Sequence, residues 1–327
     1  MKNLLILLSL FLFSFISISC TSSSSSSSTT STDNSTTTGL FVTVGDSGTI
    51  LTSSDGTWTE RTSGTSEKLY EVTYGNGTFV TVGNTGTILT SSDNGTSWDN
   101  RTSGTSKTLN GVSYVNSNFV TVGQSATFLT STNGTDWTEI TTYDAVYDNN
   151  TRITVTFNDV TYGNGLFVIV GYGGNSGTIH TSSDNGTSWI LRLSVTSGQT
   201  LYDVTYGNGT FVVVGSKGLI FTSSNGTTWS YRTSGVSNTE NLLDVTYGKG
   251  TFVSVGSGGT IVTSPYGNTW TSRTSGTSNT LEGITYGNST FMTVGWSGTV
   301  LTSSDGISWT SRTSGTSNRI NGVTYRE

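Results

Sequence analysis

Residues 69–106 read LYEVTYGNG, TFVTVGNTG, TILTSSDNG and TSWDNRTSGTS in succession. Four short runs rich in Val, Thr, Ile, Phe and Tyr are separated by Gly, Asn and Asp, and helical periodicity is absent. Such runs predict four antiparallel strands joined by tight turns. We name these four strands A, B, C and D in chain order.

The same unit recurs along the whole chain, and a tryptophan before strand D marks its period. The intervals between successive marks are 40, 39, 52, 40, 41 and 39 residues, for Trp58, Trp98, Trp137, Trp189, Trp229, Trp270 and Trp309. Seven copies at a period near 40 are typical of a closed ring of small sheets. We therefore predict an all-β fold, a seven-bladed β-propeller of four-stranded antiparallel blades.

The two ends of the repeat are out of phase. The first unit begins with strand B at residues 40–44, and the last ends with strand A at residues 320–325. The C-terminal strand should therefore pair with the N-terminal blade and close the ring, which removes exposed strand edges.

Between strands C and D lies the pattern Ser-X-Asp-X-Gly-X-X-Trp, which two copies match fully, with Asp93 and Trp98 and with Asp184 and Trp189. The carboxylate can accept backbone N–H groups inside the turn, and the tryptophan can pack between blades, so we interpret these residues as structural. The pattern resembles the Asp-box, or BNR, repeat of sialidases, the sortilin propeller and the photosystem II stability/assembly factor-like propellers. The resemblance covers residues 39–327, and its strand A–B text is most similar to the assembly-factor group. It implies the propeller fold and leaves function open, because the family is functionally mixed.

The N-terminal segment differs from the repeats. Residues 1–19 carry Lys2 and a short apolar run, the shape of a secretory signal peptide, and are followed by Cys20, the only cysteine. Small residues before this cysteine resemble a bacterial lipoprotein cleavage box, so we expect Cys20 to be lipidated; an ordinary secreted protein is the alternative. Residues 20–38 then form a Ser/Thr-rich tether, and residues 39–327 form the propeller. We expect an exported lipoprotein of the bacterial cell envelope, at the outer membrane or cell surface.

The composition narrows the partners. The formal net charge is −6, which argues against nucleic acid, and only the lipid anchor points to a membrane. No motif indicates a cofactor or metal site, and a lone histidine, His180, is a poor ligand or catalytic group. We expect a monomer whose partner is an envelope protein or a glycan.

Function should lie where the repeat is broken. The A–B and C–D turns share one end of the ring, which we call the turn face, and the B–C and D–A loops share the other, the variable face. The 52-residue interval and a longer B–C loop in the next unit add residues on the variable face, namely Tyr143, Asp144, Tyr147, Asp148, Arg152 and Tyr172. They form a candidate binding patch, or else a tolerated surface insertion.

Two further departures are candidates. At the third position of strand A, four copies carry a carboxylate, Glu71, Asp159, Asp203 and Asp244, where three carry glycine. These carboxylates would line one arc of the central channel and bind a cation or polar ligand, or else accept hydrogen bonds from neighbouring strands or simply be hydrated in a wet channel. Trp296 is the only tryptophan outside the repeated pattern and lies in a B–C loop. It would stack on a sugar or a partner side chain, or simply cover the next blade.

The sequence bears on three possible functions. Sialidase-like hydrolysis is disfavoured, because the Arg-Ile-Pro motif of that family is absent and six of the nine arginines occupy the repeated strand D position. We identify no catalytic residue. The favoured hypothesis is a non-catalytic, surface-tethered propeller that serves as a protein-interaction or assembly platform, and the alternative is a carbohydrate-binding propeller in adhesion.

Overall fold

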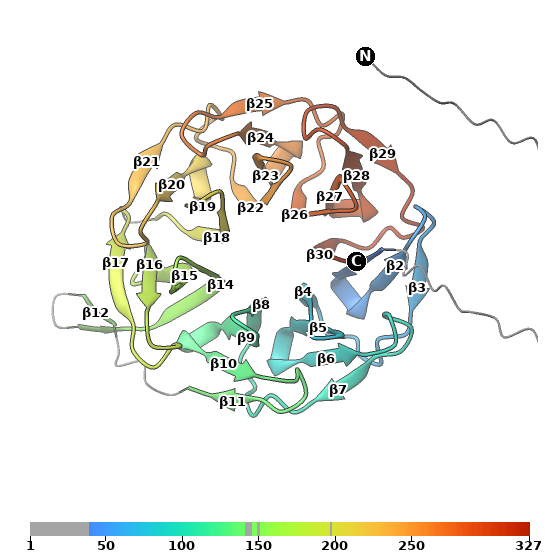
Figure 1. The fold of residues 1–327 in the computed structure, drawn as a ribbon, viewed down its shortest axis with the longest axis horizontal. Helices are drawn as coiled ribbons and strands as arrows, with labels where there is room; N and C mark the ends of the chain where they lie inside the picture. Colours follow the sequence, from blue (N-terminus) through green and yellow to red (C-terminus); the bar gives the residue numbers. More distant parts are fainter. Residues whose placement is uncertain (1–38, 141–145, 149–150, 197) are drawn as a thin grey trace, which may run out of the picture. The chain divides into compact units, whose positions relative to one another are not determined.

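A computed structural model describes residues 39–140, 146–148, 151–196 and 198–327, with only the backbone described for 146–148 and 151–153. The signal peptide, Cys20 and the tether lie outside the described residues. Residues 39–327 belong to one compact unit. Seven four-stranded antiparallel sheets surround a central channel (Figure 1), which confirms the predicted seven-bladed propeller.

Strands of the same rank occupy equivalent places in every blade. The innermost strands (A) are β4 (Leu69–Gly75), β8 (Leu109–Val115), β14 (Val155–Gly163), β18 (Leu201–Gly207), β22 (Leu242–Gly248), β26 (Leu281–Gly287) and β30 (Ile320–Arg326). The B strands are β1 (Leu40–Gly45), β5 (Thr78–Gly83), β9 (Asn118–Gly123), β15 (Leu166–Gly173), β19 (Thr210–Gly215), β23 (Thr251–Gly256) and β27 (Thr290–Gly295).

The outer half of each blade is shorter. The C strands are β2 (Ile50–Ser53), β6 (Ile88–Ser91), β10 (Phe128–Ser131), β16 (Ser176–Ser182), β20 (Ile220–Ser223), β24 (Ile261–Ser264) and β28 (Val300–Ser303). The D strands are β3 (Thr59–Arg61), β7 (Asp99–Arg101), β11 (Thr138–Glu139), β17 (Ile190–Ser194), β21 (Ser230–Arg232), β25 (Thr271–Arg273) and β29 (Thr310–Arg312). Single 3₁₀ turns form six of the B–C loops: η1 (Asp46–Gly48), η2 (Asn84–Gly86), η3 (Gln124–Ala126), η4 (Ser216–Gly218), η5 (Ser257–Gly259) and η6 (Trp296–Gly298).

The ring closes as the offset ends predict. The last strand, β30, pairs antiparallel with β1, with Phe41 opposite Tyr325 and Val42 opposite Thr324, and completes the sheet β3-β2-β1-β30. The chain therefore begins and ends in the same blade, and β1 lies between two neighbours rather than at an edge.

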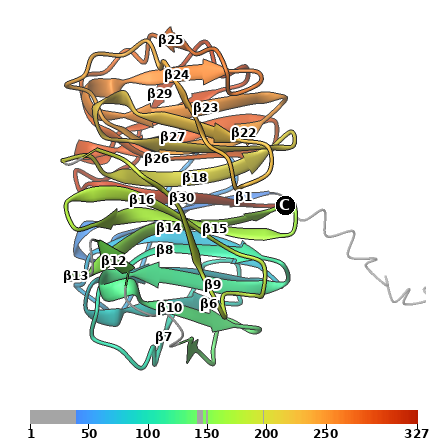
Figure 2. The same cartoon turned by 90° about the vertical axis from the view of Figure 1, so that its left-hand side faces the viewer.

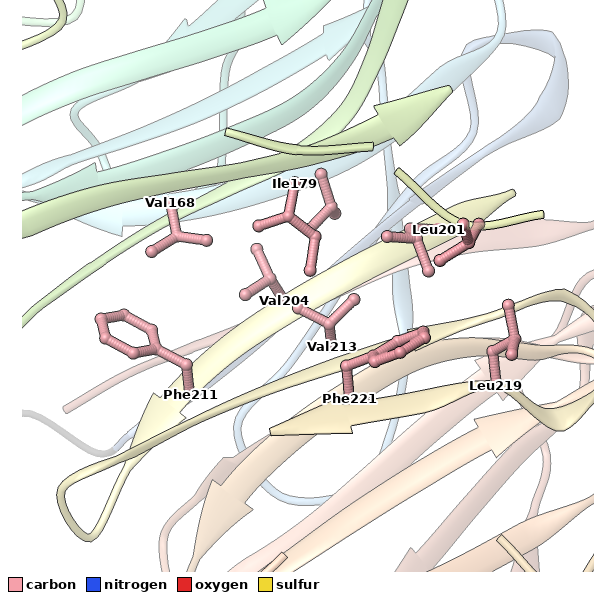
Figure 3. Close-up of a cluster of buried hydrophobic side chains, with 10 residues drawn as sticks. Val168, Ile179, Leu201, Val204, Phe211, Val213, Leu219 and Phe221 are labelled. Atoms are coloured by element: carbon pink, nitrogen blue, oxygen red, sulfur yellow. The ribbon is translucent and has the colours of Figure 1, made fainter. Parts of the chain in front are cut away.

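The core lies between blades, because each sheet is apolar on both faces. Figure 3 shows one such layer, in which Val168 and Ile179 of one blade pack with Leu201, Phe211 and other side chains of the next. Equivalent clusters join every neighbouring pair of blades. Burying each of these large side chains contributes about 1.5–3 kcal/mol, so the blades form one cooperative ring.

The fourth blade departs most from the repeat. Its strands β15 and β16 are long and meet at a tight turn, where the other blades have a 3₁₀ turn. The insertion before this blade contains a two-stranded hairpin, β12 (Val146–Asp148) with β13 (Thr151–Ile153), where we had expected only a loop. The hairpin lies outside the ring of blades in Figure 1 and toward the variable face in Figure 2, opposite the side on which the C-terminus lies.

Candidate functional site

Every innermost strand has a β-bulge near its start, and this irregularity shapes the channel wall. In β4, for example, Leu69 lies opposite Gly83 and Glu71 lies opposite Val82, so two residues span one step of the partner strand. The same shift recurs in all seven blades. A regular strand would send its second and third residues to opposite faces, whereas the bulge lets both line the channel.

The third-position carboxylates join neighbouring blades. Each accepts a hydrogen bond from a backbone N–H of the next inner strand along the ring. The donor–acceptor distances are 3.0 Å from Val112 to Glu71, 3.1 Å from Val204 to Asp159, 2.8 Å from Val245 to Asp203 and 2.7 Å from Ile284 to Asp244. The hydrogen bonding to neighbouring strands that we gave as one interpretation of these carboxylates is therefore present in the structure.

The remaining three blades carry glycine at this position because their neighbours approach too closely for a side chain. A Cβ atom would lie 2.6 Å from the Asn158 carbonyl oxygen at Gly111, 2.8 Å from that of Asn321 at Gly283, and 2.8 Å from that of Tyr70 at Gly322. Direct backbone contact replaces the carboxylate in these blades.

Three of the carboxyl groups form a row. Asp203 hydrogen-bonds to both Asp159 and Asp244, which requires protons to be held within the row, because adjacent carboxylates cannot all ionise. Burial, and after it repulsion from Asp159, raises the pKa of Asp203 well above its usual range. Burial, and after it repulsion from Asp203, raises the pKa of Asp244 in the same way. Burial raises the pKa of Glu71 as well, helped by Asp203 and Asp244.

These side chains line a cavity of about 490 Å³ that occupies the channel. The second-position residues surround its mouth on the variable face: Tyr70, Asn110, Asn158, Tyr202, Leu243, Glu282 and Asn321. This mouth, unlike the turns of the opposite face, differs from blade to blade.

One side of the mouth carries a cluster of three groups. Glu282 accepts a hydrogen bond from the Trp296 indole N–H. It also forms an ion pair with Arg319, in which a guanidinium nitrogen lies 2.7 Å from a carboxylate oxygen. The Arg319 guanidinium also lies 5.2 Å from the Trp296 ring centre, in cation–π geometry. Trp296 remains 47% exposed. We call Trp296, Glu282 and Arg319 the mouth cluster.

Tyrosines line the mouth on both sides of this cluster. Burial raises the pKa of Tyr202, and the Glu282 carboxylate and Tyr172 add to the shift. Tyr172 is itself 42% exposed. On the other side, Tyr70 donates a 3.0 Å hydrogen bond to the Asn84 side chain.

The predicted site residues do not all meet. Trp296 contacts Glu282 and Arg319, which line the cavity, and Tyr172 is close enough to influence Tyr202 there. Tyr147, Asp148 and Arg152 lie in the β12–β13 hairpin, away from the channel in Figure 1, and their side chains are not among those described. Tyr143 and Asp144 lie outside the described residues.

The sequence interpretation missed four mouth residues. Tyr70, Tyr202, Glu282 and Arg319 break the repeat just as Glu71 and its counterparts do. Tyr70, Tyr202 and Glu282 stand at the second position of strand A, where the repeat also varies, whereas Arg319 lies just before the last strand A.

The repeated Asp-containing turn has a structural role. Asp93 accepts the backbone N–H groups of Thr96 and Ser97 and the hydroxyls of Ser91 and Ser97. These hydrogen bonds lower the pKa of Asp93 to about 2. The Trp98 indole N–H donates to the Gly95 carbonyl at 3.1 Å and the ring is buried.

The turn at Asp184 and Trp189 is built the same way, and hydrogen bonds from Ser188 lower the pKa of Asp184 to about 2. The repeated strand D arginines also have internal partners, since each donates its Nε–H to a strand C threonine at 2.7–2.9 Å.

Other candidates for chemistry contribute little. His180 is fully buried against Phe157, and burial lowers its pKa to about 4. In the part of the chain that the structure describes, no group of three or more His, Cys, Asp and Glu is arranged to hold a metal ion. Among the same residues, no helix has the length and hydropathy needed to cross a bilayer.

Comparisons with known proteins define the fold. No protein-family model matches the sequence, and no curated protein matches it. A structure of YCF48 bound to a D1 peptide is similar, with 20% identity, a TM-score of 0.56 and coverage of 75% of this chain and 81% of that chain. YCF48 from Cyanidioschyzon merolae has 14% identity and a TM-score of 0.57, and the match covers 79% of this chain and 94% of that chain. The computationally designed Ika8 protein has 10% identity, a TM-score of 0.60 and 88% coverage of each chain. At these identities the likeness concerns the fold alone, and it agrees with the seven-bladed β-propeller described above.

Proposed function

We propose that this protein is a non-catalytic, surface-tethered propeller lipoprotein that acts as a protein-interaction or assembly platform. Its contact site is the channel mouth on the variable face. The observation that carries this proposal is the mouth cluster, in which a half-exposed Trp296 is held in place by Glu282 and Arg319.

The chemistry of the mouth suits a protein partner. Tryptophan, tyrosine and arginine are the residues that most often dominate binding energy at protein interfaces. Here two tyrosines and Arg319 line the cavity, and Trp296 lies beside it against Glu282 and Arg319, whose ion pair restrains the tryptophan before any partner arrives. A restrained side chain loses less conformational entropy on binding. The similar fold of YCF48, which has been solved with a D1 peptide, supports a peptide-binding role for such a propeller.

The same residues offer little for catalysis. The channel carboxylates already accept backbone N–H groups from the next blade, and Glu282 is shared by Trp296 and Arg319. Six arginines are committed to strand C threonines, so an arginine triad for a sialic acid carboxylate has no support.

A glycan is the second candidate, because the exposed ring of Trp296 could stack on a sugar. However, the Arg319 guanidinium lies over the Trp296 ring and Glu282 is already paired, which leaves fewer free polar groups for sugar hydroxyls. We therefore favour the protein partner.

The test is affinity capture from envelope extract with residues 39–327 as bait, a stretch that contains every described sheet and apolar cluster. Trp296→Ala and Arg319→Gln should each weaken the captured partner by about 30-fold or more, the effect of losing an interface residue worth about 2 kcal/mol. Tyr266→Ala is the matched control, because Tyr266 is 68% exposed on the turn face. Equal capture by all variants would place the contact elsewhere. Binding to a glycan array that Trp296→Ala abolishes would favour the adhesion alternative.

A further inference from the structure

We propose that three asparagines of the turn face, Asn76, Asn164 and Asn208, are sites of spontaneous deamidation, in which water converts the side-chain amide to a carboxylate. The reaction needs no enzyme and is independent of the function proposed above. The hydrogen bonds and the burial that the fold gives to each Asn-Gly pair decide where it occurs.

Deamidation proceeds through the backbone of the residue that follows the asparagine. The main-chain nitrogen of that residue loses its proton to base and attacks the asparagine Cγ, so that a C–N bond forms and a five-membered succinimide ring closes. The Cγ–Nδ2 bond breaks, and ammonia leaves with a proton from water. Water then opens the ring at either carbonyl and gives aspartate or isoaspartate. A following glycine favours the attack because it has no Cβ atom to hinder it.

The sequence contains nine Asn-Gly pairs, and the fold protects six of them. Four lie in the C–D turns, where the buried glycine N–H donates to the Oγ of a strand C serine at 2.8–2.9 Å, at Gly95, Gly134, Gly186 and Gly226. The other two pairs, Asn110–Gly111 and Asn321–Gly322, lie within inner strands. Each of these asparagine amides donates to a carbonyl of the next blade, at 2.8 Å and 2.7 Å.

Two asparagines of the C–D turns are also held by their own side chains. The Asn225 Oδ1 accepts the backbone N–H groups of Thr227 at 2.9 Å and Thr228 at 3.0 Å. Asn133 accepts two backbone N–H groups in the same way, both at 2.9 Å. Because the Cγ atom must rotate toward the glycine nitrogen before it can be attacked, these bonds oppose the reaction as well.

The three remaining pairs lack this protection. Asn76, Asn164 and Asn208, each with the glycine that follows, form exposed two-residue turns between strands A and B. Among the described residues, neither their side chains nor the nitrogens of Gly77, Gly165 and Gly209 have a hydrogen-bond partner.

These turns can also open without disturbing their surroundings. Each folded asparagine has a left-handed φ, of +44° at Asn76, +49° at Asn164 and +48° at Asn208, so the attack requires a transient opening of the turn. A Cβ atom added to any of the three following glycines would meet nothing within 4 Å. Exposed turns with so few contacts open at little cost in free energy.

The products would change the turn face. Aspartate and isoaspartate each add one negative charge, so reaction at all three sites would take the formal net charge from −6 to −9. Isoaspartate also lengthens the main chain by one CH₂ group within a two-residue turn, which disturbs the pairing of Gly75 with Thr78 and of the equivalent residues. The mouth cluster lies on the opposite face and keeps its residues.

The experiment incubates residues 39–327 at mildly alkaline pH in ¹⁸O-labelled water and follows each asparagine by peptide mass spectrometry. Deamidation at Asn76, Asn164 and Asn208 should be about tenfold or more faster than at Asn133 and Asn225, because attack in the C–D turns must first break several hydrogen bonds. In urea above the unfolding transition the five rates should converge, because the protection belongs to the fold.

Two variants separate the causes. Ser223→Ala removes the acceptor of the Gly226 N–H, so deamidation at Asn225 should become about threefold or more faster while the rate at Asn208 stays unchanged. Asn208→Lys copies Lys249, which stands at the equivalent place of the next blade with φ +49°. It should abolish the reaction at this position and leave the urea midpoint unchanged.

Equal rates at Asn208 and Asn225 in the folded domain would overturn the inference. Failure of all three turn-face sites to react, under conditions in which the urea-unfolded chain reacts, would overturn it as well. An unchanged rate at Asn225 in a folded Ser223→Ala variant would contradict hydrogen bonding of the glycine nitrogen as the cause of protection.

Discussion

Removal of β30 tests the closed ring most directly. A chain that stops after Arg319 loses Ile320, which is fully buried, and Val323, which is 9% exposed. It also loses the contact between Tyr325 and Phe41, whose ring centres are 4.8 Å apart. At about 1.5–3 kcal/mol for each aliphatic side chain and about 0.5–1.5 kcal/mol for the aromatic pair, the truncation should cost about 4–7 kcal/mol.

That loss is comparable to the whole stability of an ordinary folded domain, about 5–15 kcal/mol. It also leaves β1 with an unpaired edge, which favours aggregation. We expect urea unfolding of the truncated domain, followed by tryptophan fluorescence, to shift to much lower urea or to lose its cooperative transition. Deletion of Arg326 and Glu327 alone is the control and should cost under about 1 kcal/mol, because neither is buried. An unchanged midpoint after removal of β30 would refute the closure argument.

Three other predictions concern the anchor, the channel and the insertion. Cys20→Ser should move the protein from the membrane fraction to the soluble fraction, and a variant that still sediments with membranes after a salt wash would contradict lipid anchoring. Because the folded-state pKa of Asp203 is raised, its protonated form stabilises the fold at low pH, and this stabilisation is lost as the pH rises through the raised pKa. Asp203→Asn should therefore narrow the difference in unfolding free energy between pH 5 and pH 8, and an unchanged difference would count against the carboxyl row. Replacing residues 143–152 with a short Gly-Ser turn should leave the urea midpoint unchanged, and loss of partner capture in that variant would assign binding to the insertion instead of the mouth.

The sequence predicts the architecture well because one device is repeated seven times. The tryptophan spacing predicts the blades, and the unpaired strand B and strand A segments at the ends predict closure at β1 and β30. The Asp93 turn is equally predictable, since its hydrogen bonds are local in sequence.

The channel mouth is harder to predict, for a definite physical reason. The bulge at the start of each inner strand is set by how strands A and B pair, and no single residue type marks it. Without the bulge, Tyr202 and Asp203 would point to opposite faces, so only one of them would be assigned to the channel. The contact of Arg319 with Trp296 joins two blades through loops and also has no local signature.

Closure within a single blade also sets an order of events for the growing chain. Leu40, among the first propeller residues to be synthesised, pairs with Arg326, the penultimate residue of the chain. The first sheet therefore stays incomplete until β30 has been synthesised, while the six other blades can form from contiguous segments. Pulse-labelled hydrogen exchange should find the amides of β1 among the last to gain protection. Completion of the first blade thus requires that the six other blades have already been synthesised, and a chain cut short before β30 leaves β1 without its second neighbour.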